Sequence, residues 1–491
     1  MFKNIKALLA SRRALFLENI GIKQTILKNT FWLFLAEAIV RILGLFLVIY
    51  IVRVLGVEEY GKFAFAFSFV SIMAIFSDFG VVDTATRELS RSKNNEENFS
   101  SIFTLEVILC ALMLVAVFAG SFFITLDSEI RKTIWILSVF FSSNSLFGII
   151  FSFLRARQKM EYEALSRIFQ SLANTIIVFL VIFYVPSPKN VSYGYLVSNI
   201  IILFLLLLLF SFYFQPIKLK CGKYSLDILK MSWPLSLGFM ASWIYISINS
   251  VMLGYFDLII ENGWYNAASK IAIVSVIPAS LIVKSFYPML SNFYVLSREK
   301  LQKSWDYLVQ SMIFLAIPIV TGVVALAPKI INTFYGSSFY PSILALQLLI
   351  FVTGISFINF PYSIMLVVAD QQKSNFILMI AGAIVNTALN FLFIPAFSFY
   401  GAIISTIISS ILVFFSTIVL SKRLTPIRLF NKKLLGVTLI SVFSSIIMYL
   451  IISSRLVYDL NIIIVFLIGT MMFFLISASL YGFFYNKQAA H

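Results

Sequence analysis

Charged side chains inside hydrophobic segments are the first candidates for chemistry in this chain. Glu37 and Arg41 lie in one such segment, and Lys270 and Lys284 lie in another. A charged side chain at the centre of a bilayer costs at least about 2.5–3.5 kcal/mol, so each one needs a partner or a function. Three cations among few acids favour an anionic ligand. We predict a cationic cavity lined by Arg41, Lys270 and Lys284, in which Glu37 tunes Arg41 or carries a proton.

Simpler interpretations of the same residues stay open. Glu37 and Arg41 are four residues apart on one helix face, with the acid first, so they can neutralise each other. On one continuous helix Lys270 and Lys284 would be about 40° apart around the axis and about 21 Å apart along it. That spacing indicates a basic stripe, although both side chains can also extend to the membrane surface. Asp78 can cap and pin the end of its helix.

The other reactive residue types exclude several kinds of site. The single histidine is the last residue, His491, and the two cysteines, Cys110 and Cys221, are far apart. No buried histidine can then act as a base or proton relay, and neither a disulfide framework nor a zinc cluster is expected. We predict no metal and no cofactor.

Composition defines the setting of these residues. The chain has 491 residues, of which 60% are hydrophobic and 12% charged, and its mean hydropathy is +0.97. Soluble globular proteins have about 45–50% apolar and about 25% charged residues. The excess of apolar residues excludes a soluble enzyme, a disordered chain and a fibrous repeat. We therefore predict an all-α integral membrane protein.

Hydrophobic windows of about 20 residues, the length that crosses a bilayer, occur fourteen times. The predicted spans are 28–51, 62–83, 101–124, 133–154, 165–186, 192–214, 229–254, 264–288, 307–328, 341–366, 374–395, 399–420, 434–453 and 461–484. The breaks between them are short. A membrane glycan polymerase or ligase, the alternative from a different class, usually needs a larger outer loop or a clustered acidic motif.

The positive charge is distributed unevenly along these spans. If the loops alternate sides, 27 of the 37 Lys and Arg residues fall on the side of the N-terminus and seven on the other side. This bias predicts both termini in the cytoplasm. The net charge of +16 is then mainly a topology signal and does not indicate nucleic acid. Residues 1–27 are predicted to be a basic amphipathic segment on the cytoplasmic membrane surface or a flexible tail.

Landmarks recur at a spacing of a little over 200 residues. Asn174-Thr175 matches Asn386-Thr387, and SYGYLVSN at 192–199 matches FYGAIIST at 399–406. The pattern predicts two six-span lobes, 28–214 and 229–420, with two additional spans in 434–484. An even number of spans per copy gives both lobes the same orientation, about a pseudo-two-fold axis along the membrane normal, with a cavity between them. This architecture favours alternating access, and Pro234 and Gly238 are the predicted hinge.

Two stretches of the chain are similar to a known family. The first contains a G-x-x-x-Y-G turn at Gly56–Gly61 and the D-F-G…R-E end of the second span, from Asp78 to Glu88. The second is LVVADQQKSNFILMIAGAIVNTALNFLFIPAFSFYGAIIST at 366–406. With the fourteen spans and the duplication, the chain resembles bacterial and archaeal polysaccharide flippases, a family of the multidrug/oligosaccharidyl-lipid/polysaccharide exporter superfamily.

The resemblance implies a flippase in the cytoplasmic (inner) membrane that is not an enzyme. Its substrate would be a sugar repeat unit on a polyprenyl pyrophosphate carrier, moved to the outer leaflet and coupled to H+ or Na+. Arg41 and Lys270 would hold the pyrophosphate, and Glu37 and Asp78 would be the acids that couple transport to the ion. A polysaccharide polymerase and other assembly proteins would be its partners. A multidrug exporter would instead be expected to place acids in the cavity for a cationic drug. A lipid II flippase is the other alternative within the superfamily.

Overall fold

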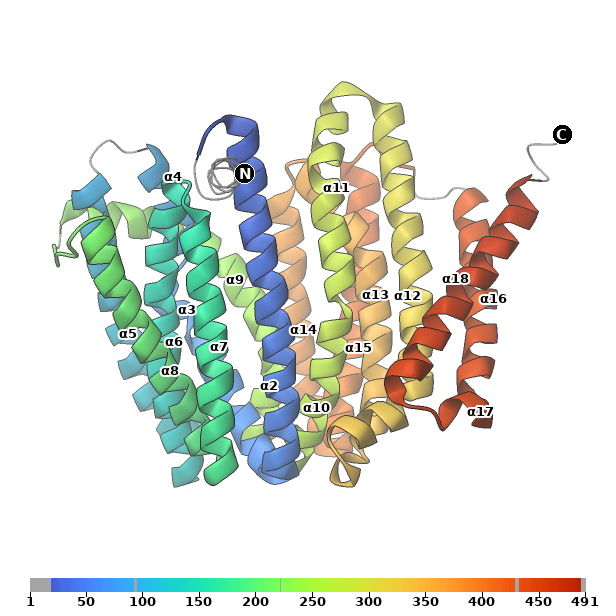
Figure 1. Cartoon of the computed structure of the whole chain (residues 1–491), viewed down its shortest axis with the longest axis horizontal. Helices are drawn as coiled ribbons and strands as arrows, with labels where there is room; N and C mark the ends of the chain where they lie inside the picture. The colour runs from blue at the N-terminus through green and yellow to red at the C-terminus, as the bar shows by residue number, and fades with distance from the viewer. Residues whose placement is uncertain (1–18, 92–94, 221, 429–431, 487–491) are drawn as a thin grey trace, which may run out of the picture. The chain divides into compact units, whose positions relative to one another are not determined.

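Long hydrophobic helices make up most of the chain in the computed structural model, which describes residues 19–91, 95–220, 222–428 and 432–486 (Figure 1). The first helices are α2 (Ile22–Met73), α3 (Ile75–Asp78), α4 (Val81–Arg91), α5 (Asn95–Ile124), α6 (Ser128–Ala156), α7 (Met160–Tyr184), α8 (Pro188–Tyr213) and α9 (Lys223–Tyr255). The others are α10 (Ile259–Ser275), α11 (Ile277–Leu296), α12 (Arg298–Phe334), η1 (Ser337–Phe339), α13 (Ser342–Val368), α14 (Gln372–Phe397), α15 (Phe399–Leu424), α16 (Lys432–Ser453), α17 (Arg455–Tyr458) and α18 (Ile462–Asn486).

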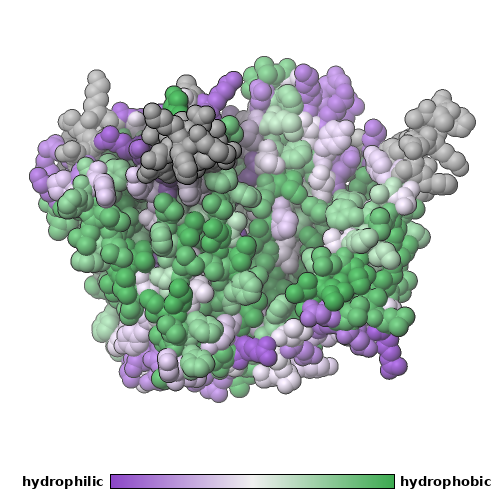
Figure 2. Space-filling view, in the orientation of Figure 1, coloured by the Kyte–Doolittle hydropathy of each residue, from purple (hydrophilic) through white to green (hydrophobic). Residues whose placement is uncertain are grey.

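The helical membrane character predicted from composition is confirmed. Among the described residues, twelve helical segments are long and apolar enough to cross a bilayer. Hydrophobic side chains cover the middle of the helices on the face drawn in Figure 2, and hydrophilic side chains gather at their ends. One segment, Lys23–Arg91, contains two of the predicted spans, and α9 contains a further one without being among the twelve. The count of fourteen crossings stays a prediction.

A glycine divides the first two predicted spans. Gly56 has φ 72° and ψ −177° and joins two helical parts of α2 at a kink. Glycine adopts positive φ without the clash that a Cβ would cause. Just beyond the kink, Lys62 Nζ lies 3.0 Å from Glu58 and 2.7 Å from Glu59. The predicted G-x-x-x-Y-G turn is therefore a glycine kink followed by a small charge cluster.

The predicted span 264–288 is not one helix. Helix α10 ends at Ser275, and α11 begins at Ile277 with Pro278 in its first turn. Proline has no N–H for the hydrogen bond that would continue the preceding helix. The geometry calculated for Lys270 and Lys284 assumed one continuous helix, and this assumption does not hold at Val276. Lys270 lies on α10 and Lys284 on α11.

The chain forms two compact units, Met1–Ser247 and Ile248–His491, and the division falls within α9. The lobe limits 28–214, 229–420 and 434–484 stay a prediction. Of the predicted surface segment 1–27, residues 1–18 lie outside the described residues. The predicted hinge residues Pro234 and Gly238 belong to α9, but their side chains also lie outside the described part, so the hinge is a prediction as well.

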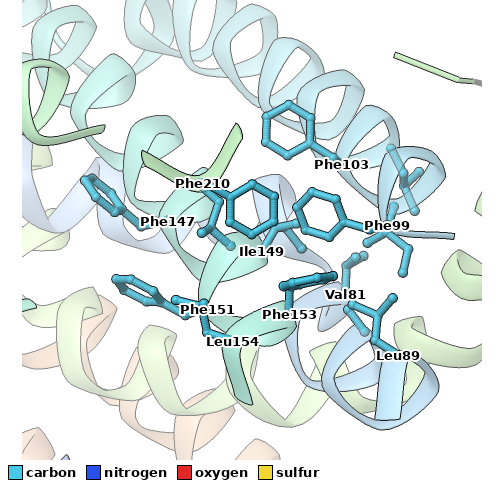
Figure 3. Packing of buried hydrophobic residues seen from close by; sticks show 14 of the residues in the cluster. Val81, Leu89, Phe99, Phe103, Phe147, Ile149, Phe151, Phe153, Leu154 and Phe210 are labelled. Carbon is cyan, nitrogen blue, oxygen red and sulfur yellow. The ribbon is translucent and has the colours of Figure 1, made fainter. Parts of the chain in front are cut away.

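Aromatic packing organises the first unit (Figure 3). Phe99 on α5, Phe153 on α6 and Phe210 on α8 are fully or almost fully buried, and their ring centroids lie 5.0–5.1 Å apart. Aromatic pairs of this kind contribute beyond their burial. The cluster also contains Phe147 and Phe151, so it fixes the face of α6 that lines the cavity described below.

The second unit has a separate core. Trp305 on α12 is completely buried, and its ring centroid lies 5.5 Å from that of Tyr362 on α13. A smaller cluster, with Met448 of α16 and Phe473 of α18, packs beside Leu326 of α12. The last two spans therefore associate with the second unit through α12.

Both units contain a helix hairpin that is closed by a glycine of the repeated motif. A Cβ on Gly194 of α8 would lie 3.1 Å from the Cα of Val178 on α7. A Cβ on Gly401 of α15 would lie only 2.1 Å from the carbonyl oxygen of Phe393 on α14. Neither contact can be relieved by rotating a flexible side chain, because both involve backbone. The matched glycines therefore allow two helices to approach closely at the same place in each unit.

We expect Gly401→Ala to lower the free energy of unfolding by at least about 3 kcal/mol, the upper end of the range for overpacking. Gly194→Ala, with the longer contact, should cost about 1–3 kcal/mol. Thermal unfolding in detergent measures both. Gly322→Ala is the control, because its Cβ would make an ordinary 3.7 Å contact with Met448. Equal stability of Gly401→Ala and Gly322→Ala would contradict the close approach.

Candidate functional site

A cavity of about 490 Å³ lies within the first unit, among α2, α4, α6, α7 and α8. Its volume falls in the range typical of small-molecule sites. Its lining residues come mainly from facing surfaces of α2, α6 and α7: Val40, Gly44, Leu47, Val48, Val82, Asn144, Phe147, Gly148, Phe151, Arg155, Arg167, Gln170, Ser171, Asn174, Thr175 and Tyr195. The wall combines apolar surface, neutral hydrogen-bonding groups and two arginines.

Neutral amides form one part of this wall. Gln170 Nε2 on α7 donates to the Oδ1 atoms of Asn144 on α6 and Asn199 on α8, each at 2.9 Å. Asn199 Nδ2 donates to Asn144 Oδ1 at 3.0 Å. Ser198 Oγ on α8 donates to Asn174 Oδ1 on α7. The network fixes the amide planes, and amides can donate to and accept from ligand hydroxyl groups.

Two arginines and one glutamate form the charged part of the wall. Arg155 Nε and Nη2 lie 2.8 and 2.6 Å from the two carboxylate oxygens of Glu163, and Arg167 Nη2 lies 2.8 Å from the same carboxylate. The Glu163 side chain is 0% exposed, whereas Arg155 is 24% and Arg167 35% exposed. These three residues carry a net charge of +1. Within the described chain, Arg167 Nε is buried and has no hydrogen-bond partner.

Local structure explains the position of this cluster. Arg155 lies in the last turn of α6 and Glu163 in the first turn of α7, where each charge interacts favourably with the helix dipole. The intervening turn contains Gln158 in the left-handed region, at φ 57°. Lys159 N donates to Leu154 O at 2.8 Å across this turn. The turn brings two residues eight positions apart into a bidentate ion pair.

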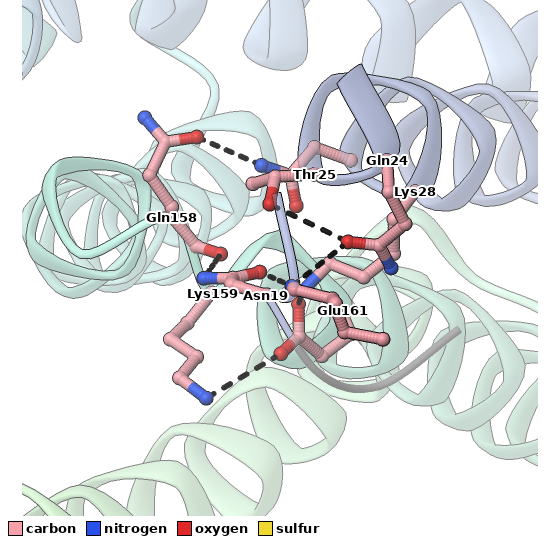
Figure 4. Close-up of polar contacts among 9 residues, drawn as sticks. Asn19, Gln24, Thr25, Lys28, Gln158, Lys159 and Glu161 are labelled. Carbon is pink, nitrogen blue, oxygen red and sulfur yellow. Dashed lines mark hydrogen bonds and ion pairs between the residues drawn. The ribbon is translucent and has the colours of Figure 1, made fainter. Parts of the chain in front are cut away.

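A second, fully buried ion pair holds the same turn (Figure 4). Lys28 Nζ on α2 lies 2.9 Å from Glu161 Oε2 on α7, with side-chain exposures of 0% and 3%. Lys28 Nζ also donates to Asn19 Oδ1 at 2.7 Å, and Asn29 Nδ2 donates to Gln158 Oε1 at 2.8 Å. The start of α2 is therefore attached to the α6–α7 turn, beside the arginine cluster.

The sequence predicted other residues for the site. Arg41 Nε donates to Glu37 Oε1 at 2.6 Å, so the two form the expected pair, but the side chains are 45% and 41% exposed. Neither is among the described residues that line the cavity. Asp78 Oδ1 accepts from the Val82 backbone N–H at 2.9 Å and so caps the start of α4. Their roles in substrate binding and ion coupling stay predictions.

The two predicted lysines belong to the second unit. Lys270 on α10 is half-buried, and Lys284 on α11 is exposed. Their assignment to a cationic substrate site stays a prediction. The polar residues buried in this unit include Asn249, Asn390 and Thr406: Asn249 Nδ2 donates to Thr406 Oγ1, and Asn390 Nδ2 donates to Asn249 Oδ1, at 2.7 and 2.6 Å.

Arg155 and Arg167 are not among the site residues predicted from the sequence, where they belong to the positive charge on the side of the N-terminus. A signal was present, because Glu163 and Arg167 are spaced for an i,i+4 pair in the turn RARQKMEYEALSR. Glu161 and Glu163 are also two acids among four cations in that stretch. The sequence does not show the geometry of the α6–α7 turn, which brings Arg155 to the pair of Glu163 and Arg167.

The chain is similar in sequence and in fold to known membrane proteins. Residues 26–294 match the family model described as "Polysaccharide biosynthesis protein". A protein described as an O-antigen transporter of Shigella dysenteriae is 23% identical over 409 residues, 79% of this chain and 97% of its own length. A protein described as a flippase, AglR, of Haloferax volcanii is 25% identical over 382 residues, 74% of this chain and 77% of its own length.

Solved structures of similar fold include the lipid II flippase MurJ in an inward closed conformation. Its TM-score is 0.74 at 18% identity, with coverage of 93% of this chain and 99% of that one. An inward-facing multidrug resistance MATE family transporter of the MOP superfamily has a TM-score of 0.61 at 15% identity, covering 77% of this chain and 94% of that one. At these identities the likeness establishes the fold alone.

We expect Glu161→Leu to lower the free energy of unfolding by about 3–5 kcal/mol, because it leaves Lys28 buried without its counterion. The double variant Lys28→Met/Glu161→Leu should recover much of this loss, since it removes both charges. Thermal unfolding of the full chain in detergent measures the difference. A double variant no more stable than the single one would show that Lys28 and Glu161 are not coupled in this way.

Proposed function

Because the chain belongs to the polysaccharide biosynthesis protein family, we propose that it moves a lipid-linked oligosaccharide across the cytoplasmic membrane. The substrate is a sugar repeat unit on polyprenyl pyrophosphate, transferred from the inner to the outer leaflet. Family membership makes the chain a multi-pass membrane transporter and not an enzyme. The observation that carries the proposal is the cavity of the first unit, where an arginine cluster and an amide wall occur together.

The cavity suits the two polar parts of such a substrate. Arginine guanidinium groups bind phosphate oxygens in pairs, and Arg155 and Arg167 expose part of their side chains there. Gln170 lines the same cavity about one helical turn after Arg167 on α7, and Asn144 lines it about three turns before Arg155 on α6. Their amides match the hydroxyl groups of a sugar. The polyprenyl chain stays in the lipid.

Transport in this proposal follows alternating access. Fourteen spans form two six-helix lobes with two additional C-terminal spans, both termini are cytoplasmic, and the lobes move about Pro234 and Gly238. Arg41, Lys270 and Lys284 supply further positive charge along the path. Glu37 and Asp78 couple the movement to a proton or sodium gradient. A polysaccharide polymerase and other assembly proteins take up the product.

A lipid II flippase is the second candidate, and the similar fold of the lipid II flippase MurJ is compatible with it. That substrate also carries a pyrophosphate, so the arginine cluster is compatible with it. A multidrug exporter is less consistent with the cavity, because a cationic drug would meet two arginines whose only paired carboxylate, among the described contacts, is fully buried.

The transport proposal predicts protein-dependent movement of a labelled polyprenyl-pyrophosphate oligosaccharide in proteoliposomes. Protection of the sugar from an external sugar-modifying enzyme measures the movement. Imposed proton and sodium gradients, tested separately, should identify the coupling ion. Lipid II and a cationic dye serve as alternative substrates in the same vesicles. Movement of lipid II alone would favour the second candidate, and dye efflux alone would contradict both flippase assignments.

The proposed cationic path predicts that Arg41→Ala and Lys270→Ala each slow flipping several-fold at a normal expression level. Each variant removes one positive charge that would attract the pyrophosphate of the substrate. The exposed pair Glu299 and Lys303 offers a control, because Lys303→Ala removes a cation 68% exposed at the start of α12. Full transport by both Arg41→Ala and Lys270→Ala would exclude these residues from the path.

A further inference from the structure

We propose that Glu163 is an internal counterion that the phosphate of the substrate displaces from Arg155 and Arg167. The carboxylate of Glu163 forms ion pairs with both guanidinium groups. When the substrate binds, its phosphate forms these ion pairs instead. Glu163 thereby limits the affinity for the substrate and favours its release. This inference rests on the proposed function and adds a named residue that sets the binding strength.

The first step of the argument is access. The carboxylate of Glu163 is 0% exposed, so a ligand in the cavity cannot touch it without rearrangement. The two guanidinium groups border the cavity and are partly exposed, at 24% and 35% for the side chains of Arg155 and Arg167. The buried Nε of Arg167 is without a hydrogen-bond partner in the described chain. The cations therefore face the ligand, and their counterion lies behind them.

The second step is chemical similarity. Arginine binds carboxylate and phosphate with the same planar, paired N–H donors. The bidentate contact of Arg155 with Glu163, at 2.6 and 2.8 Å, is the arrangement that a phosphate group would also use. A pyrophosphate carries more negative charge than one carboxylate, so it can compete for the same donors. The loss of two buried ion pairs by Glu163 opposes this exchange.

The third step compares the two units. The α13–α14 turn of the second unit has the same form as the α6–α7 turn: Asp370 has φ 59°, and Gln371 N donates to Leu366 O at 2.8 Å. Yet the positions 212 residues after Arg155, Glu163 and Arg167 hold only uncharged residues, Val367, Asn375 and Met379. The same turn thus forms without the charged cluster. The cluster is therefore not a requirement of the fold, which favours a role in binding.

Other charges near the cluster do not replace Glu163. Asp83 on α4 interacts electrostatically with Arg155 but is exposed, so water screens it. Glu161 is engaged by Lys28 at 2.9 Å, and Lys159 lies 4.0 Å from it. Glu163 is the carboxylate that the described ion pairs place on both arginines. It is therefore the group whose removal should change the strength of phosphate binding most.

The test measures binding of geranyl pyrophosphate, a short soluble probe, to the purified full chain in detergent by calorimetry. Glu163→Gln should bind the probe at least about tenfold more tightly than the unaltered protein, because a competing charge is lost. Glu163→Asp, which keeps the charge, should stay near the unaltered affinity. Arg167→Gln should weaken binding at least about tenfold. Glu299→Gln is the control, because this acid on α12 is 78% exposed and does not line the cavity, and it should leave the affinity unchanged.

The outcomes separate this inference from the transport proposal. Unchanged or weaker binding by Glu163→Gln, in a variant that unfolds at the unaltered temperature, overturns the counterion role. Failure of the unaltered protein to bind the probe overturns it as well, even when the vesicle assay shows transport. Tighter binding by Glu163→Gln together with slower flipping at saturating substrate supports it. Probe binding with the expected variant effects, but without transport of any lipid-linked oligosaccharide, supports the counterion and overturns the flippase.

Discussion

Two carboxylates buried at the start of α7 are paired with cations, and these ion pairs organise the helix contacts around the cavity. Glu163 pairs with two arginines and Glu161 pairs with Lys28, and both acids lie in the first turn of α7. The pairs determine where α2, α6 and α7 meet and therefore where the cavity forms. Because an unpaired buried charge is costly, the arrangement also limits how the site can change. A ligand that removes one partner from Glu163 must itself satisfy the arginines.

The two units use a common framework with different polar interiors. Asn174 and Asn386 occupy matched positions, and each bonds to a hydroxyl on the following helix: Asn174 accepts from Ser198, and Asn386 donates to Ser409. The matched glycines Gly194 and Gly401 close the two hairpins. Around this framework the first unit places an arginine cluster and the second unit a neutral network. In our proposal, the first unit of the duplicated fold therefore binds the charged part of the substrate.

The sequence was sufficient for the features that depend on local pattern. Hydrophobic length predicted the helical membrane segments, and the i,i+4 spacing predicted the pair of Glu37 and Arg41. The predicted G-x-x-x-Y-G turn begins at the glycine where α2 is kinked. The candidate site needed more. Arg155 reaches Glu163 only because Gln158 adopts a left-handed conformation in the turn, which residue types alone do not reveal. The relative position of Lys270 and Lys284 could not be calculated from the sequence for a related reason, since the break before Ile277 divides the helix that the calculation assumed.

A structure of the full chain with a bound polyprenyl-pyrophosphate oligosaccharide tests the account most directly. The account predicts the pyrophosphate within hydrogen-bond distance of Arg155 and Arg167, with Glu163 no longer in contact with both. It also predicts sugar against Gln170 and Asn144. A pyrophosphate bound elsewhere, with Glu163 still holding both arginines and the cavity of the first unit empty, would contradict it.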